Sequence, residues 1–201
     1  MISATSLSFS RGNHQIYKDF SAYLDKGEAV LLTGANGTGK STLIALIGGL
    51  LQPQSGKIEI DGADIANLSA IAQAKLRSIA PQRRSFTLAF TVAEILHLLP
   101  KKMRIADSSK FIEKLGLKDL LTKKVTELSI GQQERVSLAL ALSQEADYYL
   151  LDEPFSAQDL HSTQMILEII NELKANKKGV LLISHNQDAI SKYFDRVISL
   201  A

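Results

Sequence analysis

The sequence predicts an open α/β fold whose central sheet is mostly parallel. Short apolar runs typical of strands alternate with longer stretches of helical periodicity, and several runs are continuous, as expected for strands buried on both faces. A chain of 201 residues, 45% of them hydrophobic, is long enough to form one domain with its own core. We therefore expect a single domain over residues 1–201.

Local patterns predict the individual elements. The strand-like runs occupy residues 28–33, 57–60, 147–151, 179–184 and 196–200. Apolar residues at helical spacing predict helices over residues 41–51 and from residue 162 to a stop at Gly179. Because residues 56–62 form a strand that ends in a turn at Asp61 and Gly62, we expect an N-terminal antiparallel β subdomain beside the parallel core.

An inserted helical subdomain is predicted in the middle of the chain. Strand-like runs are absent between about Gln82 and Leu128, whereas residues 91–99 and 108–121 have helical periodicity. Thr91, and Ser108 or Ser109, stand where helix N-caps are expected. Residues 83–128 are therefore interpreted as an inserted α-helical subdomain.

Composition excludes several classes of function. The 23 Lys and Arg residues against 21 Asp and Glu give a net charge of only +2, so we expect no nucleic-acid partner. There is no cysteine, which excludes disulfides, thiolate metal sites and a cysteine nucleophile. The chain has neither a signal-peptide pattern nor a run of roughly 18 apolar residues. We therefore expect a soluble chain whose membrane role, if any, acts through a partner.

A glycine-rich stretch between the strand at 28–33 and the next helix fits the phosphate-loop pattern G-x-x-x-x-G-K-[ST]. Glycines let backbone N–H groups turn toward phosphate oxygens, and Lys40 neutralises the outer phosphates. Ser41 is expected to place its hydroxyl on Mg²⁺. A glycine turn with a solvated lysine is the alternative. The stretch predicts a P-loop NTPase core whose nucleotide-binding residues are Gly34, Ala35, Asn36, Gly37, Thr38, Gly39, Lys40, Ser41 and Thr42.

Two adjacent carboxylates, Asp152 and Glu153, follow the apolar run at 147–151. The carboxyl end of a buried parallel strand is where ligands gather in open α/β sheets. Asp152 is therefore a candidate Mg²⁺ ligand, directly or through water, and Glu153 a candidate to orient or deprotonate the attacking water. The alternative is a polar strand end that leads into a turn at Pro154.

With these two phosphate motifs in place, four further motifs resemble those of the ATP-binding-cassette (ABC) ATPases. LSIGQQERV at 128–136 resembles the family signature, APQ at 80–82 the glutamine loop, SAQDL at 156–160 the D-loop, and LLISHN at 181–186 the switch histidine. All six motifs occur in the family's order and cover nearly the whole chain. The signature is equally consistent with a helix N-terminus capped by Ser129, which is also an anion site.

The resemblance implies an ATPase that binds ATP and Mg²⁺ and forms a head-to-tail dimer on ATP. Each ATP would lie between the phosphate loop of one chain and the signature of a second copy. The motifs imply that Gln82 reaches the Mg²⁺ and senses a membrane partner, and that His185 contacts the γ-phosphate beside the catalytic Glu153. They also imply that four residues contact the nucleotide of the second copy or lie at the dimer seam: Ser129, Gly131, Gln132 and Asp159.

The chain departs from the family pattern at two positions. Ile130 stands where the signature usually has glycine, which reduces backbone freedom next to the γ-phosphate. Arg11 follows "LSFS" where an aromatic residue usually stacks on adenine. Because a guanidinium plane can also stack on a base, Arg11 is predicted to contact the nucleotide.

The resemblance also indicates the membrane partners. It implies polytopic permease subunits, possibly with a substrate-binding protein, and a peripheral position at the cytoplasmic face of the cell membrane. Residues 85–100 resemble the groove that receives a coupling helix of the permease. The alternative is that the apolar residues of this segment build the core of the helical subdomain; they are Leu88, Phe90, Val92, Ile95 and Leu98.

Two stretches, "PQ…FTVAEIL" and the run into "LGLKDLL", resemble ATPases that drive import of metals or metal chelates. The predicted function is therefore ATP hydrolysis coupled to such import. A haem-export-type ABC ATPase and a soluble ABC ATPase that remodels a protein assembly remain as alternatives. A P-loop kinase or GTPase is disfavoured, because neither needs a signature or a switch histidine.

Overall fold

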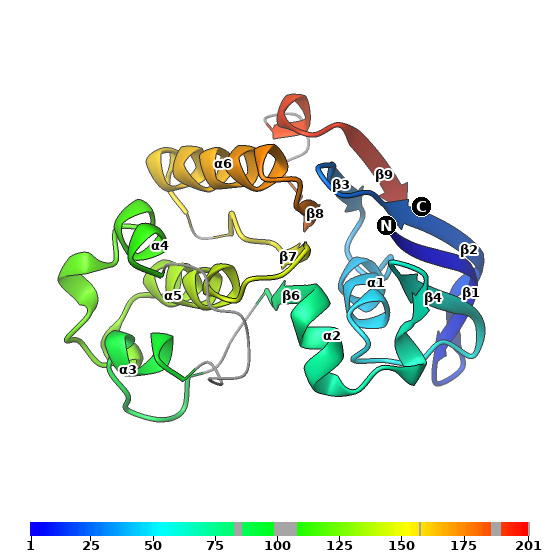
Figure 1. The fold of residues 1–201 in the computed structure, drawn as a ribbon, viewed down its shortest axis with the longest axis horizontal. Helices are drawn as coiled ribbons and strands as arrows, with labels where there is room; N and C mark the ends of the chain where they lie inside the picture. Colours follow the sequence, from blue (N-terminus) through cyan, green and yellow to red (C-terminus); the bar gives the residue numbers. More distant parts are fainter. Residues whose placement is uncertain (83–85, 99–107, 157, 186–189, 201) are drawn as a thin grey trace.

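A computed structural model describes residues 1–82, 86–98, 108–156, 158–185 and 190–200. It confirms the α/β class, with a P-loop NTPase arrangement of two sheets (Figure 1). A five-stranded parallel sheet has the order β6-β7-β8-β3-β9, and a four-stranded antiparallel sheet has the order β2-β1-β4-β5. The strands are β1 (Ile2–Arg11), β2 (His14–Leu24), β3 (Ala29–Gly34), β4 (Ser55–Ile60), β5 (Ala63–Asp64), β6 (Arg77–Ala80), β7 (Tyr148–Asp152), β8 (Gly179–Ile183) and β9 (Arg196–Leu200).

The helices cover both faces of the parallel sheet. In Figure 1, α1 lies between the two sheets, whereas α5 and α6 lie beyond the parallel sheet on its other side. The α-helices are α1 (Lys40–Ile47), α2 (Ala70–Leu76), α3 (Val92–Leu96), α4 (Ser108–Lys114), α5 (Ile130–Ser143) and α6 (Leu160–Ala175). Short 3₁₀ turns are Ile65–Asn67, Lys118–Leu120, Val125–Glu127 and Ser191–Tyr193. None of the helices within the described ranges is both long and apolar enough to span a bilayer.

The parallel sheet is buried on both faces, which explains its continuous apolar strands. In β7, Tyr148 and Leu150 pack in the cluster that contains α1 and the antiparallel sheet. Tyr149 and Leu151 pack in the cluster that contains α5 and α6. Because side chains alternate along a strand, each strand contributes to both clusters. The carboxyl ends of β3, β7 and β8 are thereby held rigidly at one edge of the sheet.

The helical subdomain is built as expected in its described parts. Thr91 caps α3 in a capping box with Glu94, which confirms this predicted N-cap. Ser108 and Ser109 lie inside α4 rather than before it, so neither is the predicted cap; the residues just before α4 lie outside the described ranges. Within the described residues 86–98 and 108–128, the only β-type pairing is one isolated bridge between Thr91 and Lys124. The boundaries at 83 and 128 stay a prediction.

Two predicted helix ends are wrong. The helix predicted over 41–51 ends at Ile47, because Gly48 and Gly49 form its C-terminal turn, and Leu50 is 65% exposed. Gly179 is not a helix stop but the first residue of β8; α6 ends at Ala175. A Cβ on Gly179 would lie 2.6 Å from the Tyr148 ring, so glycine is needed there for close strand packing.

Candidate functional site

The phosphate loop connects β3 to α1 and requires glycine at two positions. Gly34 has a φ of 144°, and a Cβ there would lie 2.5 Å from the carbonyl oxygen of Leu200. Gly39 has a φ of 98°, and its Cβ would lie 2.4 Å from Cγ2 of Ile16. Side chains larger than hydrogen do not fit these conformations and contacts. The loop is therefore held between β9 on one side and β2 on the other.

Lys40 is the first residue of α1 and is directed back into the loop. Its side chain is buried, and Nζ donates hydrogen bonds of 2.8 Å to the carbonyl oxygens of Gly34 and Ala35. The Tyr17 hydroxyl donates to the Gly39 carbonyl at 2.8 Å and fixes the far end of the loop. The ammonium group and the positive end of α1 thus converge on one space, as a polyphosphate site requires.

Asp152 ends β7 beside this loop. Its side chain is buried, and its Oδ1 has no hydrogen-bond partner among the described residues. Burial raises the pKa of Asp152, against a hydrogen bond from Ser41 and the charge of Lys40. A buried carboxylate oxygen left unpaired next to a hydroxyl fits Mg²⁺, which takes only one or two ligands from protein. Asp152 and Ser41 would hold that ion, and Gln82 lines the same cavity as Ser41.

Glu153 follows directly and has an unusual backbone. Its φ is 54°, in the left-handed region that non-glycine residues rarely adopt, and its N–H donates to the Ile183 carbonyl at 3.1 Å. Its Oε1 lies 3.0 Å from His185 Nε2, at ion-pair distance, although no described residue donates a hydrogen bond to that oxygen. Burial raises the pKa of Glu153, and His185 opposes that rise. The carboxylate is therefore held beside His185 at the edge of the cavity that the phosphate loop lines.

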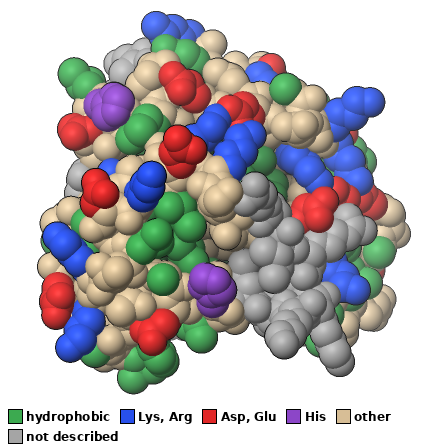
Figure 2. All heavy atoms as spheres, turned by 60° about the vertical axis from the view of Figure 1, so that its left-hand side comes forward, with side chains coloured by type: hydrophobic (Ala, Val, Ile, Leu, Met, Phe, Trp, Pro, Cys, Tyr) green, Lys and Arg blue, Asp and Glu red, His purple; other side chains and the backbone are tan. Residues whose placement is uncertain are grey.

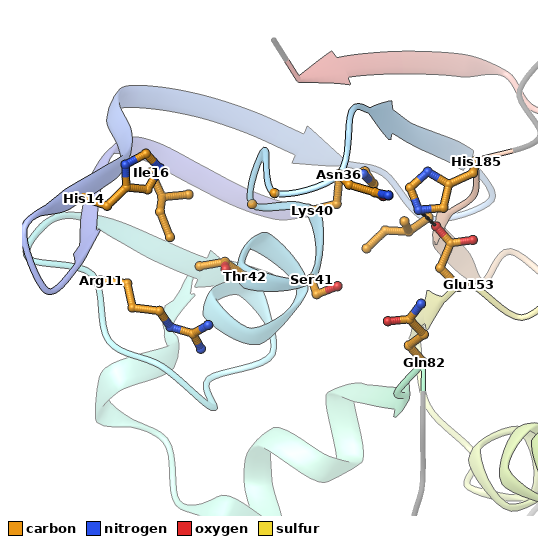
Figure 3. A pocket seen from close by; sticks show the side chains of 13 residues that line it. Arg11, His14, Ile16, Asn36, Lys40, Ser41, Thr42, Gln82, Glu153 and His185 are labelled. Atoms are coloured by element: carbon orange, nitrogen blue, oxygen red, sulfur yellow. Dashed lines mark ion pairs between the residues drawn. The ribbon is translucent and has the colours of Figure 1, made fainter.

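Except for Asp152, the side chains of these groups line one cavity of about 400 Å³ (Figure 3). Glu153 and His185 lie at one end, and Arg11 lies at the other, beyond the loop. The structure thus brings together most of the predicted phosphate, metal and catalytic residues. Those that line the cavity are Arg11, Asn36, Gly37, Gly39, Lys40, Ser41, Thr42, Gln82, Glu153 and His185. Gly34, Ala35 and Thr38 form the loop behind it.

The signature residues gather elsewhere, at the start of α5. Ser129 caps this helix in a capping box with Gln132, and Asp159 caps α6 by accepting from the Ser162 N–H at 2.7 Å. Together with Gly131 they line a second cavity of about 450 Å³, which shares no lining residue with the first. Within one chain, therefore, the predicted signature contacts do not meet the phosphate loop.

Ile130 lies at the surface of this second cavity and is 70% exposed. Its side chain therefore packs against little, and Ser129 is positioned by its own capping box. We expect Ile130→Gly to change the steady-state ATPase rate by less than about threefold, since removal of an exposed contact costs little. A rate change of a hundredfold or more would show that the isoleucine itself takes part in nucleotide contact.

Some lining residues were not predicted. His14 and Ile16 line the first cavity, although neither belongs to a recognisable motif of the sequence. Arg135 and Gln158 line the second; Gln158 Nε2 donates to the Gly131 carbonyl at 3.1 Å. A signal for His14 was its position two residues before Ile16 on a strand, which places both on one face.

The fold and site define a phosphate-loop nucleoside triphosphatase. The family described as ABC transporter matches residues 17–156, and the chain belongs to this family as an ATPase that binds ATP. It is 34% identical to the manganese transport system ATP-binding protein MntB of Bacillus subtilis (strain 168), with 92% of this chain and 77% of the relative covered. It is also 34% identical to the hemin import ATP-binding protein HmuV of Bordetella avium, with 100% and 82% covered.

Similarity extends to exporters and to solved structures. The chain is 33% identical to the macrolide export ATP-binding/permease protein MacB of Shewanella sp. (strain W3-18-1), covering 99% of this chain and 32% of that relative. A structure titled "Structure of ATP binding subunit of ABC transporter" superposes with a TM-score of 0.91 at 27% identity, covering 100% of this chain and 85% of the other. The family and the fold are thus established by sequence and structure together.

Proposed function

We propose that this ATPase drives import of a metal or metal chelate through separate membrane subunits. The similarity to MntB and HmuV, relatives named for manganese transport and hemin import, supports this cargo class. The observation that supports ATP-driven dimerisation is the split of the nucleotide motifs between two cavities of one chain. Within a single chain, bound phosphates would contact the phosphate loop but not the signature residues. Two chains in head-to-tail contact would place each signature over the other chain's phosphate loop, so ATP would itself hold the dimer together.

The roles of the first cavity follow from its charges. The phosphate loop and Lys40 bind the phosphates, and Mg²⁺ held by Asp152, Ser41 and Gln82 neutralises charge on the terminal phosphates when bound. Glu153 orients or deprotonates the attacking water, and His185 contacts the γ-phosphate. Ser129, Gly131, Gln132 and Asp159 act on the nucleotide or seam of the second copy.

The surface that would receive the permease lies on the helical subdomain. Val92 and Ile95 belong to the buried core, so for these residues the packing interpretation holds. The side chains of Leu88 and Leu98 are instead 62% and 60% exposed, and that of Phe90 is 37% exposed. Figure 2 shows acidic and basic side chains interspersed on the face that carries the subdomain, with apolar side chains gathered between them. We infer that this apolar surface contacts a coupling segment of a membrane subunit at the cytoplasmic face of the membrane.

Leu98→Glu tests this docking surface. The variant should bind the permease at least about tenfold more weakly, because the new carboxylate would be desolvated in an apolar contact without a partner. The isolated subunit should keep its ATPase rate and melting temperature. Ile71→Glu is the matched control, because Ile71 is 55% exposed on α2, and should leave co-purification with the permease unchanged. Equal recovery of permease with both variants would remove the Leu98 surface from the interface.

The direction and cargo are tested in membrane vesicles that carry the chain with its permease. In vesicles whose cytoplasmic face is exposed to the medium, the lumen corresponds to the cell exterior. An importer should therefore move Mn²⁺, Zn²⁺ or haem from the lumen into the medium, and only when ATP is supplied. Transport of these substrates in the opposite direction would favour the haem-export alternative. Stable complexes that contain only soluble proteins would favour the remodelling alternative.

A further inference from the structure

We infer that His14 supplies the ring on which the nucleotide base stacks, across the hairpin from Arg11. This inference rests on the proposed function, because it assigns the base end of the same nucleotide site. Position 11 holds arginine where the family usually has an aromatic residue. The structure places an aromatic ring directly opposite that position, contributed by the neighbouring strand.

The hairpin between β1 and β2 fixes this pair. Arg11 and His14 are Cα partners in the antiparallel register, and a two-residue turn joins them. Gly12 in that turn has a φ of 60°, which closes the hairpin tightly. Both side chains line the nucleotide cavity. They therefore form two sides of its base end.

The strand also sets the distance from the phosphates. His14 and Ile16 line the cavity whereas Gln15 between them does not, as the alternation of a strand requires. Ile16 packs against Gly39 at the end of the phosphate loop. His14 lies two residues farther along β2, roughly 7 Å away. Figure 3 shows His14 farther from Ser41 than Ile16 is. A sugar fits this interval, so a bound nucleotide would bring its base to the imidazole.

The chemistry of these side chains suits a purine base. The imidazole offers a flat face for stacking, and Ile16 provides an apolar contact for the sugar or the base edge. Arg11 has only donors, which match the N7 acceptor of both purines and the O6 acceptor of guanine. Glu153, the one carboxylate among the described lining residues, lies at the opposite end of the cavity. We therefore expect adenine and guanine nucleotides to bind with similar affinity.

Calorimetry with ADP, GDP and inorganic pyrophosphate tests the assignment without hydrolysis. His14→Ala should weaken ADP and GDP binding by roughly 5- to 20-fold, the effect of losing one base-stacking contact, and leave pyrophosphate binding unchanged. His14→Phe should bind ADP within about twofold of wild type, because it restores a ring. Gln15→Ala, on the opposite face of the same strand, is the matched control and should bind all three ligands normally.

The other outcomes would contradict the assignment of His14 or of the site. Wild-type ADP affinity in His14→Ala, or failure of His14→Phe to restore it, overturns the stacking assignment. An equal loss of pyrophosphate affinity would mean that His14 acts through the phosphate loop, which also overturns it. If Arg11→Ala alone loses base affinity, the base stacks on the guanidinium instead. If the wild-type chain binds no pyrophosphate, the proposed nucleotide site itself fails, so the two failures are distinguishable.

Discussion

Glu153→Gln should lose ATP hydrolysis by at least about 100-fold while its affinity for ATP stays within about threefold of wild type. The amide keeps the shape of the side chain but cannot accept the proton of the attacking water. Binding survives because the phosphates are held by the loop and by Lys40 rather than by this carboxylate. Phosphate release measured at saturating ATP, together with calorimetric binding, separates the two effects.

Two controls sharpen this expectation. The backbone at Glu153 has a positive φ, which the amide variant tolerates no worse than the acid, so the melting temperatures should agree. Glu145→Gln changes an acid at the opposite end of β7 and should leave hydrolysis intact. Hydrolysis at the wild-type rate in Glu153→Gln would remove Glu153 from the chemical step.

Lys40→Ala should weaken nucleotide binding by roughly 100-fold or more. The ammonium group is the cation at the centre of the loop, and each charge-assisted hydrogen bond it makes to phosphate contributes about 1.5–3 kcal/mol. Titration with ADP and with inorganic pyrophosphate should show the same loss, because the contact is to phosphate and not to the base.

The variant also loses the hydrogen bonds of Lys40 to Gly34 and Ala35, so its fold must be checked. Circular dichroism and the melting temperature distinguish a collapsed loop from an unfolded chain. Lys18→Ala, an exposed lysine on β2, is the matched control and should bind normally. ATP affinity at the wild-type level in a folded Lys40→Ala protein would contradict the phosphate-loop assignment.

Much of this site could be predicted from sequence because its determinants are local. The phosphate loop lies between one strand and the next helix, so spacing alone predicts Lys40 and Ser41. The same holds for Asp152 and Glu153, which follow a continuous apolar strand. Parallel topology then brings the carboxyl ends of β3 and β7 to one edge, as the structure confirms.

Features that depend on contacts between distant segments could not be predicted in this way. His14 enters the cavity only because β2 packs against the phosphate loop, where Ile16 meets Gly39. Gly179 has a packing role that requires knowledge of the neighbouring Tyr148 ring. The two short elements α2 and β6 were missed because Ala70–Leu76 and Arg77–Ala80 are too brief to show a period.

The central claim is that two copies of the chain share each ATP between a phosphate loop and a signature. The most direct test is the mass of Glu153→Gln in solution, measured by size exclusion with light scattering, with MgATP and then with MgADP. We expect a dimer with ATP and a monomer with ADP, because uncleaved ATP keeps both sets of contacts. Adding Ser129→Arg to this variant should prevent the dimer. A variant that is inactive, binds ATP and remains monomeric with it would contradict the shared site.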